Sequence, residues 1–455
     1  MSNDGYQVIR PLGPVTEAMH TLGTGGVARS GFCSMTLKGR MDDEAMKAAI
    51  VQVYKEFPAL ACRVGERRHG LLHRLDRIPL DSVPALGVMN GYADDLQGLS
   101  YNDALDRLLE PYYLRGIDVH NEAPAQFYLA HFPDNHHAMV NYFHHIGSDA
   151  GTMMKLIART FAIYHELVKG EPPDWAQTKG MTSSVARRPP RLHPVSVIRR
   201  MRAEAARLKD HPLIRMVDPD RIRTAHRYVV RRTLTEDETS AMAATAKRLG
   251  MTVNDFVSVA CVRAIDELLG TPEGTLSFWI PVNLRATVKD HHGRMNFASA
   301  VNVDLIREER KDREKLGALF VERRKAHMTG ATAETNLRLL RLLLGLSHLF
   351  PERVRGPRLK KLFHAPMSFM NSNVGVLWPR FDNGKLTTDS VMTCAGDCEI
   401  LDYDVNFSTD ESLGHGLVAY TYRKRFTLNF SGYRDLFERE TMERFLDIIK
   451  RELLE

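Results

Sequence analysis

Apolar and polar positions in the first third of the chain switch between strand-like alternation and helix-like recurrence. Residues 30–39 predict a strand, and residues 42–57 repeat apolar side chains every three to four positions behind two aspartates, which predicts an amphipathic helix. Residues 125–132 and 138–143 predict two strands joined by the turn-like sequence PDN. A helix with one apolar stripe is predicted over 151–168.

The second half of the chain continues this mixture of elements. Thr235, with Glu238 three residues later, has the form of a capping box and predicts the start of a helix that Gly250 ends. Thr252 and Asp255 predict the start of the next helix. Five strands and a C-terminal helix are predicted to follow: 275–284, 297–305, 367–377, 416–423, 425–433 and the helix 440–453.

These patterns indicate a mixed α/β protein, with α+β two-layer lobes and more than one core. A chain of 455 residues exceeds the usual size of a single hydrophobic core. We expect an N-terminal lobe over 1–180, a basic crossover rich in proline and arginine over 181–232, and a C-terminal lobe over 233–455. Each lobe would combine strands with helices on one side, and the seam between two lobes is a usual place for a ligand.

Composition and charge narrow the class of protein. With 44% hydrophobic and 26% charged residues the chain is ordinarily globular, and its net charge of +6 favours an acidic partner: a nucleotide-bearing cofactor, an acidic carrier protein or an anionic membrane surface. The five cysteines have no disulfide rhythm, the N-terminus has no signal-peptide layout, and no apolar run reaches the roughly 18 residues of a membrane span. We expect a monomer in a reducing, cytoplasmic compartment. We also expect no binding of nucleic acid, because no recognised nucleic-acid module accompanies the charge.

The stretch NYFHHIGSDAG, residues 141–151, places two histidines and an aspartate where a predicted strand gives way to a predicted helix. Side chains at such a junction project into a cleft, and a neutral imidazole is the usual group that takes a proton from an alcohol or amine near pH 7. We interpret His145 as the base and His144 as a structural residue buried behind it. Asp149 would turn away from the cleft, pair with a basic group and fix the histidine loop.

Other interpretations of this stretch stay open. Adjacent histidines at a strand end can be hydrogen-bonded residues at the edge of a core. A metal site would draw on five histidines that cluster in sequence: His131, His136, His137, His144 and His145. Adjacent strand residues point to opposite faces, so His144 and His145 cannot easily share one ion, and we expect no metal. A catalytic triad could use Ser148, which lacks the sequence of a nucleophile elbow.

The segment HHIGSDAG closely resembles the HHxxxDG signature of the superfamily that contains chloramphenicol acetyltransferase, nonribosomal peptide condensation domains, polyketide-associated acyltransferases, alcohol acetyltransferases and wax-ester synthases. Further segments are similar to the same superfamily in the same order: 41–64, 123–151, 249–265, 280–285 and 296–305. The resemblance therefore covers most of the chain. One departure is Ala150, which stands where the family usually has glycine and could crowd the start of the helix.

The resemblance implies a fold and a reaction. It implies two chloramphenicol-acetyltransferase-like lobes that form a pseudo-dimer around a central tunnel, with His145 at the midpoint. An acyl thioester on a phosphopantetheine arm, either acyl-CoA or a carrier protein, would be the co-substrate, and no cofactor would stay bound. His145 would deprotonate a hydroxyl or amine acceptor as it attacks the thioester carbonyl, without a covalent acyl-enzyme.

The resemblance also implies roles for supporting residues. His144 and Asp149 complete the catalytic motif, and Asp149 would act through an arginine, with Arg285 the first candidate and Arg63 the second. A bidentate arginine–carboxylate pair suits a permanent brace, although Arg285 could equally be an ordinary surface residue. The tetrahedral intermediate needs a hydrogen-bond donor. Donor candidates lie in one polar insertion and could instead serve turns: Ser368, Asn371, Ser372 and Asn373.

The basic stretches 187–232 and 337–363 bear on partners. The second interleaves leucine with arginine and lysine, which is typical of a helix packed on a core; it could also dock an acidic carrier protein or make peripheral contact with a lipid monolayer. We expect an acyltransferase that makes an ester from a thioester donor and a small-molecule or lipid hydroxyl. The alternatives are a free-standing condensation enzyme that makes an amide and a non-catalytic relative that binds carriers or lipids, which Ala150 keeps open.

Overall fold

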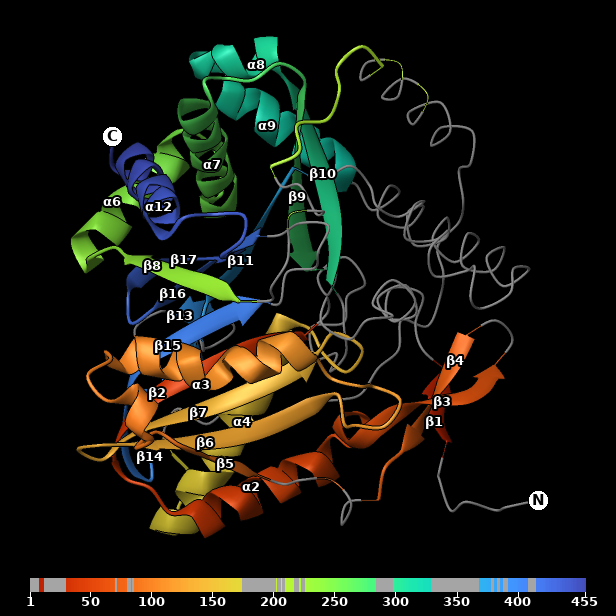
Figure 1. The fold of residues 1–455 in the computed structure, drawn as a ribbon, viewed down its shortest axis with the longest axis vertical. Helices are drawn as coiled ribbons and strands as arrows, with labels where there is room; N and C mark the ends of the chain where they lie inside the picture. The colour runs from red at the N-terminus through yellow and green to blue at the C-terminus, as the bar shows by residue number, and fades with distance from the viewer. Residues whose placement is uncertain are drawn as a thin grey trace. The chain divides into compact units, whose positions relative to one another are not determined.

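The computed structural model shows two compact units, each built from more than one stretch of the chain (Figure 1). The first unit combines residues 1–185 with 291–297 and 376–408, and the second combines the rest. The structure describes these residues: 8–11, 30–69, 72–79, 83, 86–173, 202, 206, 209–216, 221, 226–283, 298–328, 368–377, 380–382, 385–387, 392–407 and 415–455.

The first unit is organised on a six-stranded sheet in the order β14-β15-β2-β7-β6-β5. Its neighbours pair antiparallel except β5 and β6, which are parallel. The strands are β2 (Ser30–Arg40), β5 (Gly87–Asn90), β6 (Ala125–Phe132), β7 (His136–His144), β14 (Cys394–Ala395) and β15 (Asp397–Phe407). Two small sheets hold β1 (Val8–Pro11), β3 (Cys62–His69) and β4 (Leu72–Arg77), and β12 (Arg380–Asp382) and β13 (Lys385–Thr387).

Helices cover both faces of this sheet. They are α2 (Asp43–Glu56), α3 (Tyr101–Arg115) and α4 (Ala150–Lys169), with short 3-10 turns at Pro58–Ala61 and Asp94–Leu96. On one face Leu105 of α3 packs with Val140 and Tyr142 of β7. On the other face Tyr54 of α2 meets the ring of Phe127 edge-on at 5.6 Å. Figure 1 shows α3 and α4 on opposite sides of the strands. The sequence predicted α2 and α4 but not α3. The expectation that this lobe has helices on one side only is therefore wrong, because α3 covers the other face.

A strand from the C-terminal half completes the first sheet. β15 pairs along β2, with Val405 opposite Cys33 and Asp397 opposite Arg40. Blue β15 therefore runs beside the much earlier β2 in Figure 1. Residues 376–408 thus belong to the first unit, an exchange that the expected C-terminal lobe of 233–455 did not include.

The second unit has its own six-stranded sheet in the order β10-β9-β11-β16-β17-β8. Its strands are β8 (Arg227–Thr233), β9 (Thr275–Asn283), β10 (Ala298–Ile306), β11 (Phe369–Val376), β16 (His415–Tyr422) and β17 (Arg425–Tyr433). Its helices are α6 (Glu236–Arg248), α7 (Val253–Leu269), α8 (Arg307–Lys311), α9 (Arg313–Met328) and α12 (Arg439–Leu454). A core of buried apolar side chains, among them Phe278, Phe430 and Ile449, joins the sheet to the helices.

The predicted helix starts of the second unit are confirmed. Thr235 and Glu238 form the capping box of α6, and Thr252 and Asp255 form that of α7. β8 was not predicted, because its sequence RYVVRRT closes the arginine-rich crossover and masks the apolar alternation; it pairs antiparallel with β17. The stretch 337–363 lies outside the described residues. No helix within the described part of the chain is long and apolar enough to cross a membrane.

Candidate active site

The end of β7 and the loop that follows it carry the histidine pair, and two backbone hydrogen bonds hold this segment. The amide of His144 donates to the carbonyl of Pro124 at 2.7 Å, which extends the β6–β7 ladder by one position. The amide of Gly147 donates to the carbonyl of His144 at 3.0 Å and closes a tight turn. The chain therefore reverses sharply after β7 before α4 begins.

His145 is the partly exposed residue of this loop, and its tautomer follows from its partner. Its Nδ1 lies 3.2 Å from the carbonyl oxygen of Ser148. A carbonyl can only accept, so Nδ1 carries the proton and donates it to this bond. In the neutral ring Nε2 is then the proton-accepting nitrogen, which is the state that a general base needs. The ring of Phe143 lies edge-on to the imidazole, with centroids 5.7 Å apart.

His144 has the opposite tautomer. Its Nδ1 accepts a hydrogen bond from the amide of Ile146 at 3.1 Å, so in the neutral ring the proton resides on Nε2. The side chain is buried, with 2% of its surface exposed. The two histidines therefore differ in exposure, tautomer and partner, and the ring of His144 ties the turn that presents His145.

Asp149 begins α4. Its carboxylate accepts from the amide of Thr152 at 2.7 Å, as an N-cap residue does, and its side chain is buried. Ala150 follows as the first helical residue, and its backbone lies outside the left-handed region that favours glycine. The alanine that departs from the family motif is therefore compatible with the local backbone.

Of the two arginines expected to brace Asp149, the structure describes Arg63. Arg63 lies on β3, opposite Asp76 of β4, and is partly buried. Arg285 lies outside the described residues. The carboxylate of Asp149 caps its own helix, and the arginine brace stays a prediction.

The expected oxyanion donors lie on and beside β11 in the second unit, and two of them are committed to the fold. The hydroxyl of Ser368 donates to the carbonyl of Ile214 at 2.6 Å and accepts from the amide of Ser277 at 2.9 Å. The amide group of Asn371 donates to Asn254 and Ser258 of α7.

The other two expected donors, Ser372 and Asn373, lie on β11. The side-chain oxygen of Asn373 accepts from the amide of Gly375 at 2.8 Å, which leaves its amide group out of that bond. Ser372 is 7% exposed. For Ser372 and Asn373 the role of oxyanion donor stays a prediction.

His131 and His137, which flank the turn between β6 and β7, form a different network. The Nδ1 atoms of His131 and His137 lie 2.8 Å apart, Nε2 of His131 contacts Asp43, and Nε2 of His137 donates to the carbonyl of Gly39. Burial lowers the pKa of His137. No group of three or more metal-ligating side chains that could hold an ion occurs among the residues that the structure describes.

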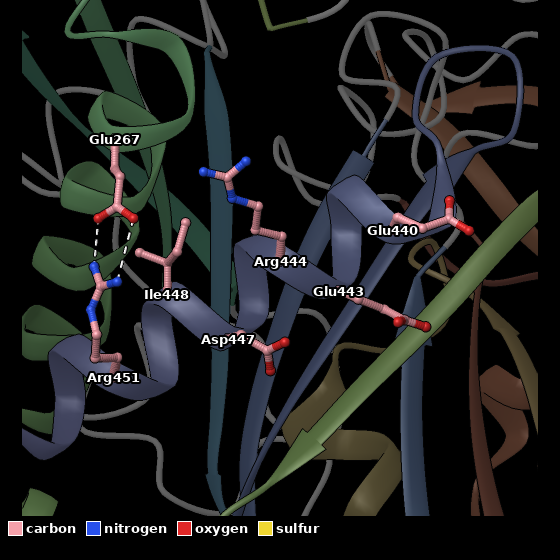
Figure 2. Close-up of a pocket in the computed structure, with 7 residues that line it drawn as sticks. All are labelled: Glu267, Glu440, Glu443, Arg444, Asp447, Ile448 and Arg451. Carbon is pink, nitrogen blue, oxygen red and sulfur yellow. Dashed lines mark hydrogen bonds and ion pairs between the residues drawn. The ribbon is translucent and has the colours of Figure 1, made fainter.

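An open groove lies on the second unit, between α7 and α12 (Figure 2). Its walls carry both signs of charge, and Glu267 of α7 pairs with Arg451 of α12 across it. The lining residues are Glu267, Glu440, Glu443, Arg444, Asp447, Ile448 and Arg451. None of the residues that line this groove belongs to the histidine loop, so the groove is separate from the site on that loop.

Sequence reasoning missed the two backbone carbonyls that organise the site. Those of Pro124 and Ser148 fix the histidine loop and the tautomer of His145. Every residue has a carbonyl, so no sequence pattern could have pointed to these two.

Residues 224–333 match the family model described as the phthiocerol/phthiodiolone dimycocerosyl transferase C-terminus. The isonitrile lipopeptide synthase of Mycobacterium tuberculosis is 30% identical over 150 residues, which are 31% of this chain and 5% of that protein. This chain thus spans a small part of the curated relative. The histidine loop lies outside the segment matched by the family model.

Solved structures share the whole fold. Trichothecene 15-O-acetyltransferase of Fusarium sporotrichioides has a TM-score of 0.71 at 13% identity, covering 100% of this chain and 96% of that one. Polyketide synthase associated protein 5 of Mycobacterium tuberculosis has a TM-score of 0.64 at 15% identity, covering 99% and 98%. The first condensation domain of the calcium-dependent antibiotic synthetase has a TM-score of 0.66 at 14% identity, covering 98% and 97%. The sequence resemblance is confirmed: the chain has the mixed α/β, two-lobed fold of the chloramphenicol acetyltransferase-like and condensation-domain superfamily.

Proposed function

We propose that the protein is an acyltransferase that moves an acyl group from a thioester to a hydroxyl acceptor, with His145 as the general base. The observation that carries the proposal is the hydrogen bond from Nδ1 of His145 to the carbonyl of Ser148, because it selects the neutral tautomer whose Nε2 can take a proton. The related proteins are acyltransferases and condensation enzymes, which supports acyl transfer in general.

The reaction needs one base and two proton transfers. Nε2 of His145 takes the proton of the acceptor hydroxyl as its oxygen attacks the thioester carbonyl carbon, and an oxyanion forms. A hydrogen-bond donor would stabilise that oxyanion, and Ser372 and Asn373 stay the predicted candidates for this role. The intermediate collapses, the carbon–sulfur bond breaks, and the imidazolium returns its proton to the leaving thiolate. Donor and acceptor thus supply every atom that is exchanged, and His145 ends the cycle neutral.

The donor is an acyl-CoA or an acyl group on a phosphopantetheinyl carrier protein, used as a co-substrate with no cofactor kept between turnovers. The net charge of +6 suits either donor, since both are anionic. The described cysteines form no disulfide: Cys33, Cys62, Cys261, Cys394 and Cys398. A reduced cytoplasmic compartment stays part of this proposal. We also keep the predicted tunnel and the monomeric state as parts of this proposal.

An amide product is the second candidate. Condensation domains share the fold, and the isonitrile lipopeptide synthase matches part of the sequence. The same base would take a proton from an amine acceptor, so the histidine loop fits both products.

The test is transfer itself. The protein is incubated with a panel of acyl-CoA and acyl-carrier thioesters and with paired alcohol and amine acceptors of equal chain length, and products are identified by mass spectrometry. We expect ester formation that depends on His145. Amide as the sole product would favour the second candidate, and no product with any pair would favour a non-catalytic relative.

A further inference from the structure

We infer that two packing contacts, each of which requires a glycine, position the imidazole of His145: the ring of Phe143 over Gly31, and the ring of Pro124 against Gly147. This inference rests on the proposed function, in which that imidazole is the base. It assigns positioning roles to residues that neither the motif nor the comparisons single out.

The first contact lies on the sheet. Phe143 on β7 is directly opposite Gly31 on β2. A Cβ at position 31 would lie 2.9 Å from Cζ and 3.2 Å from Cε1 of the Phe143 ring, so the ring occupies the space above the glycine. The same ring meets His145 edge-on at 5.7 Å, two residues further along the chain. The position of Phe143 therefore limits where the imidazole can lie.

The second contact lies in the turn. A Cβ at position 147 would lie 2.9 Å from Cγ and 3.0 Å from Cβ of Pro124. The proline ring cannot rotate away as a flexible side chain would, and its carbonyl also accepts the amide of His144 at 2.7 Å. A side chain at 147 would thus move the turn itself.

That movement would reach the base directly. Gly147 precedes Ser148, whose carbonyl holds Nδ1 of His145. Neither Gly31 nor Gly147 has left-handed backbone, so each position needs glycine for space and not for conformation. A displacement of about 1 Å at a reacting group can cost about 100-fold in rate, which sets the size of the expected effect.

The experiment compares Gly147→Ala and Gly31→Ala with the control Gly317→Ala. Gly317 lies in α9 of the second unit, where a Cβ would meet the flexible Met251 sulfur at 3.3 Å. We expect kcat to fall about 10- to 100-fold for the first two variants, with KM for donor and acceptor unchanged. The control should stay within about twofold of the parent, because its contact involves a side chain that can move.

A second measurement reports on the imidazole ring of His145 and not on the rate of transfer. Nitrogen-15 NMR of labelled histidine should report Nδ1–H for His145 in the parent, and a mixture of tautomers or a weakened Nδ1 hydrogen bond in Gly147→Ala. The double variant Pro124→Ala/Gly147→Ala should recover part of the lost kcat, since alanine at position 124 removes the Cγ atom nearest the new methyl group.

The outcomes separate the inference from the proposed function. A parent protein without transferase activity would remove the proposed function, while the NMR measurement would still test the positioning of the ring. Parental kcat and an unchanged histidine spectrum in both glycine variants would overturn the inference. If Gly147→Ala does not fold, Gly31→Ala and Phe143→Leu give the same test on the sheet side, with a loss of kcat and a shifted His145 signal expected.

Discussion

The two units contain the same local motif, a β-hairpin followed by a long helix, and use it differently. In the first unit β6 and β7 lead into α4, and in the second β16 and β17 lead into α12. The first hairpin ends in His144 and His145, with one ring buried and the other partly exposed. The second ends in Tyr433 and Arg434, which are bound into the edge of their sheet.

The bonding of the second hairpin end shows what separates a site from a structural junction. The buried Arg227 donates to the hydroxyl of Tyr433 at 2.8 Å and lies over its ring at 4.4 Å. Arg434 donates to the carbonyl of Arg227 and lies over the ring of Tyr228. An arginine stays charged and cannot accept a proton, so this junction stabilises the sheet edge and offers no base. The proposed chemistry therefore belongs to the first hairpin, which is followed by a histidine and not by an arginine.

Substitution of His145 and of Arg434, which follow the two hairpins, gives the largest expected difference in transfer rate. His145→Ala should lower the transfer rate by about 10²- to 10⁴-fold with little loss of stability, because the base is removed from a partly exposed position. Arg434→Ala should keep the rate and lower the free energy of unfolding, since it removes a hydrogen bond and a ring contact. Steady-state kinetics and urea unfolding measure the two effects. A His145→Ala variant near the parental rate would contradict the proposed base.

The next largest expected effect comes from substitutions at the N-caps of α4 and α12. Asp149 caps α4 through its carboxylate, whereas Glu438, at the described start of α12, makes no side-chain cap bond. Asp149→Ala should lower stability by about 1 kcal/mol and also lower activity, and Glu438→Ala should change stability by less than about 0.5 kcal/mol.

The variant Asp149→Asn distinguishes the role of Asp149 as a helix cap from the role of its negative charge. Asp149→Asn keeps an oxygen for the amide of Thr152, so a cap role predicts near-parental stability. A loss as large as that of alanine would favour the predicted arginine brace, which needs the negative charge. Urea unfolding of the three proteins decides between the two roles.

The hairpin turns come third. Asp134 and Asn135 in the first turn, and Arg423 and Lys424 in the second, have positive φ. Asparagine and aspartate tolerate this backbone better than lysine or arginine do. Lys424→Gly should raise the unfolding free energy by up to about 1 kcal/mol, and Asn135→Gly by less. An equal gain at both positions would show that side-chain contacts, and not backbone strain, control these turns.

The smallest effect concerns pH. Burial lowers the pKa of His137 below its ordinary value of 6.5, so the unfolded chain binds more protons than the folded one in this range. The stabilising contribution is complete above pH 6.5 and is lost as the pH falls through the lower folded value. His137→Gln should reduce the drop in melting temperature between pH 7.5 and pH 5 relative to the parent. An unchanged drop would place the titrating groups elsewhere in the fold.

The sequence by itself determined most elements and pointed to His145 as the predicted base. Capping pairs such as Thr235 with Glu238 and Thr252 with Asp255 are local, so they specified the starts of α6 and α7 correctly. The histidine motif is also local, and the fold that its superfamily resemblance implied is shown by the similarity to solved structures. What could be predicted was whatever depends on residues within about four positions of one another.

Only the tertiary structure decided the features that join distant parts of the chain. β15 completes a sheet with β2 across more than 350 residues, and β8 pairs with β17 although its composition resembles a linker. The commitment of Ser368 to Ile214 and Ser277 likewise depends on strands that meet in space. Strand pairing and close packing are set by long-range complementarity of backbone and volume, which a one-dimensional pattern does not encode.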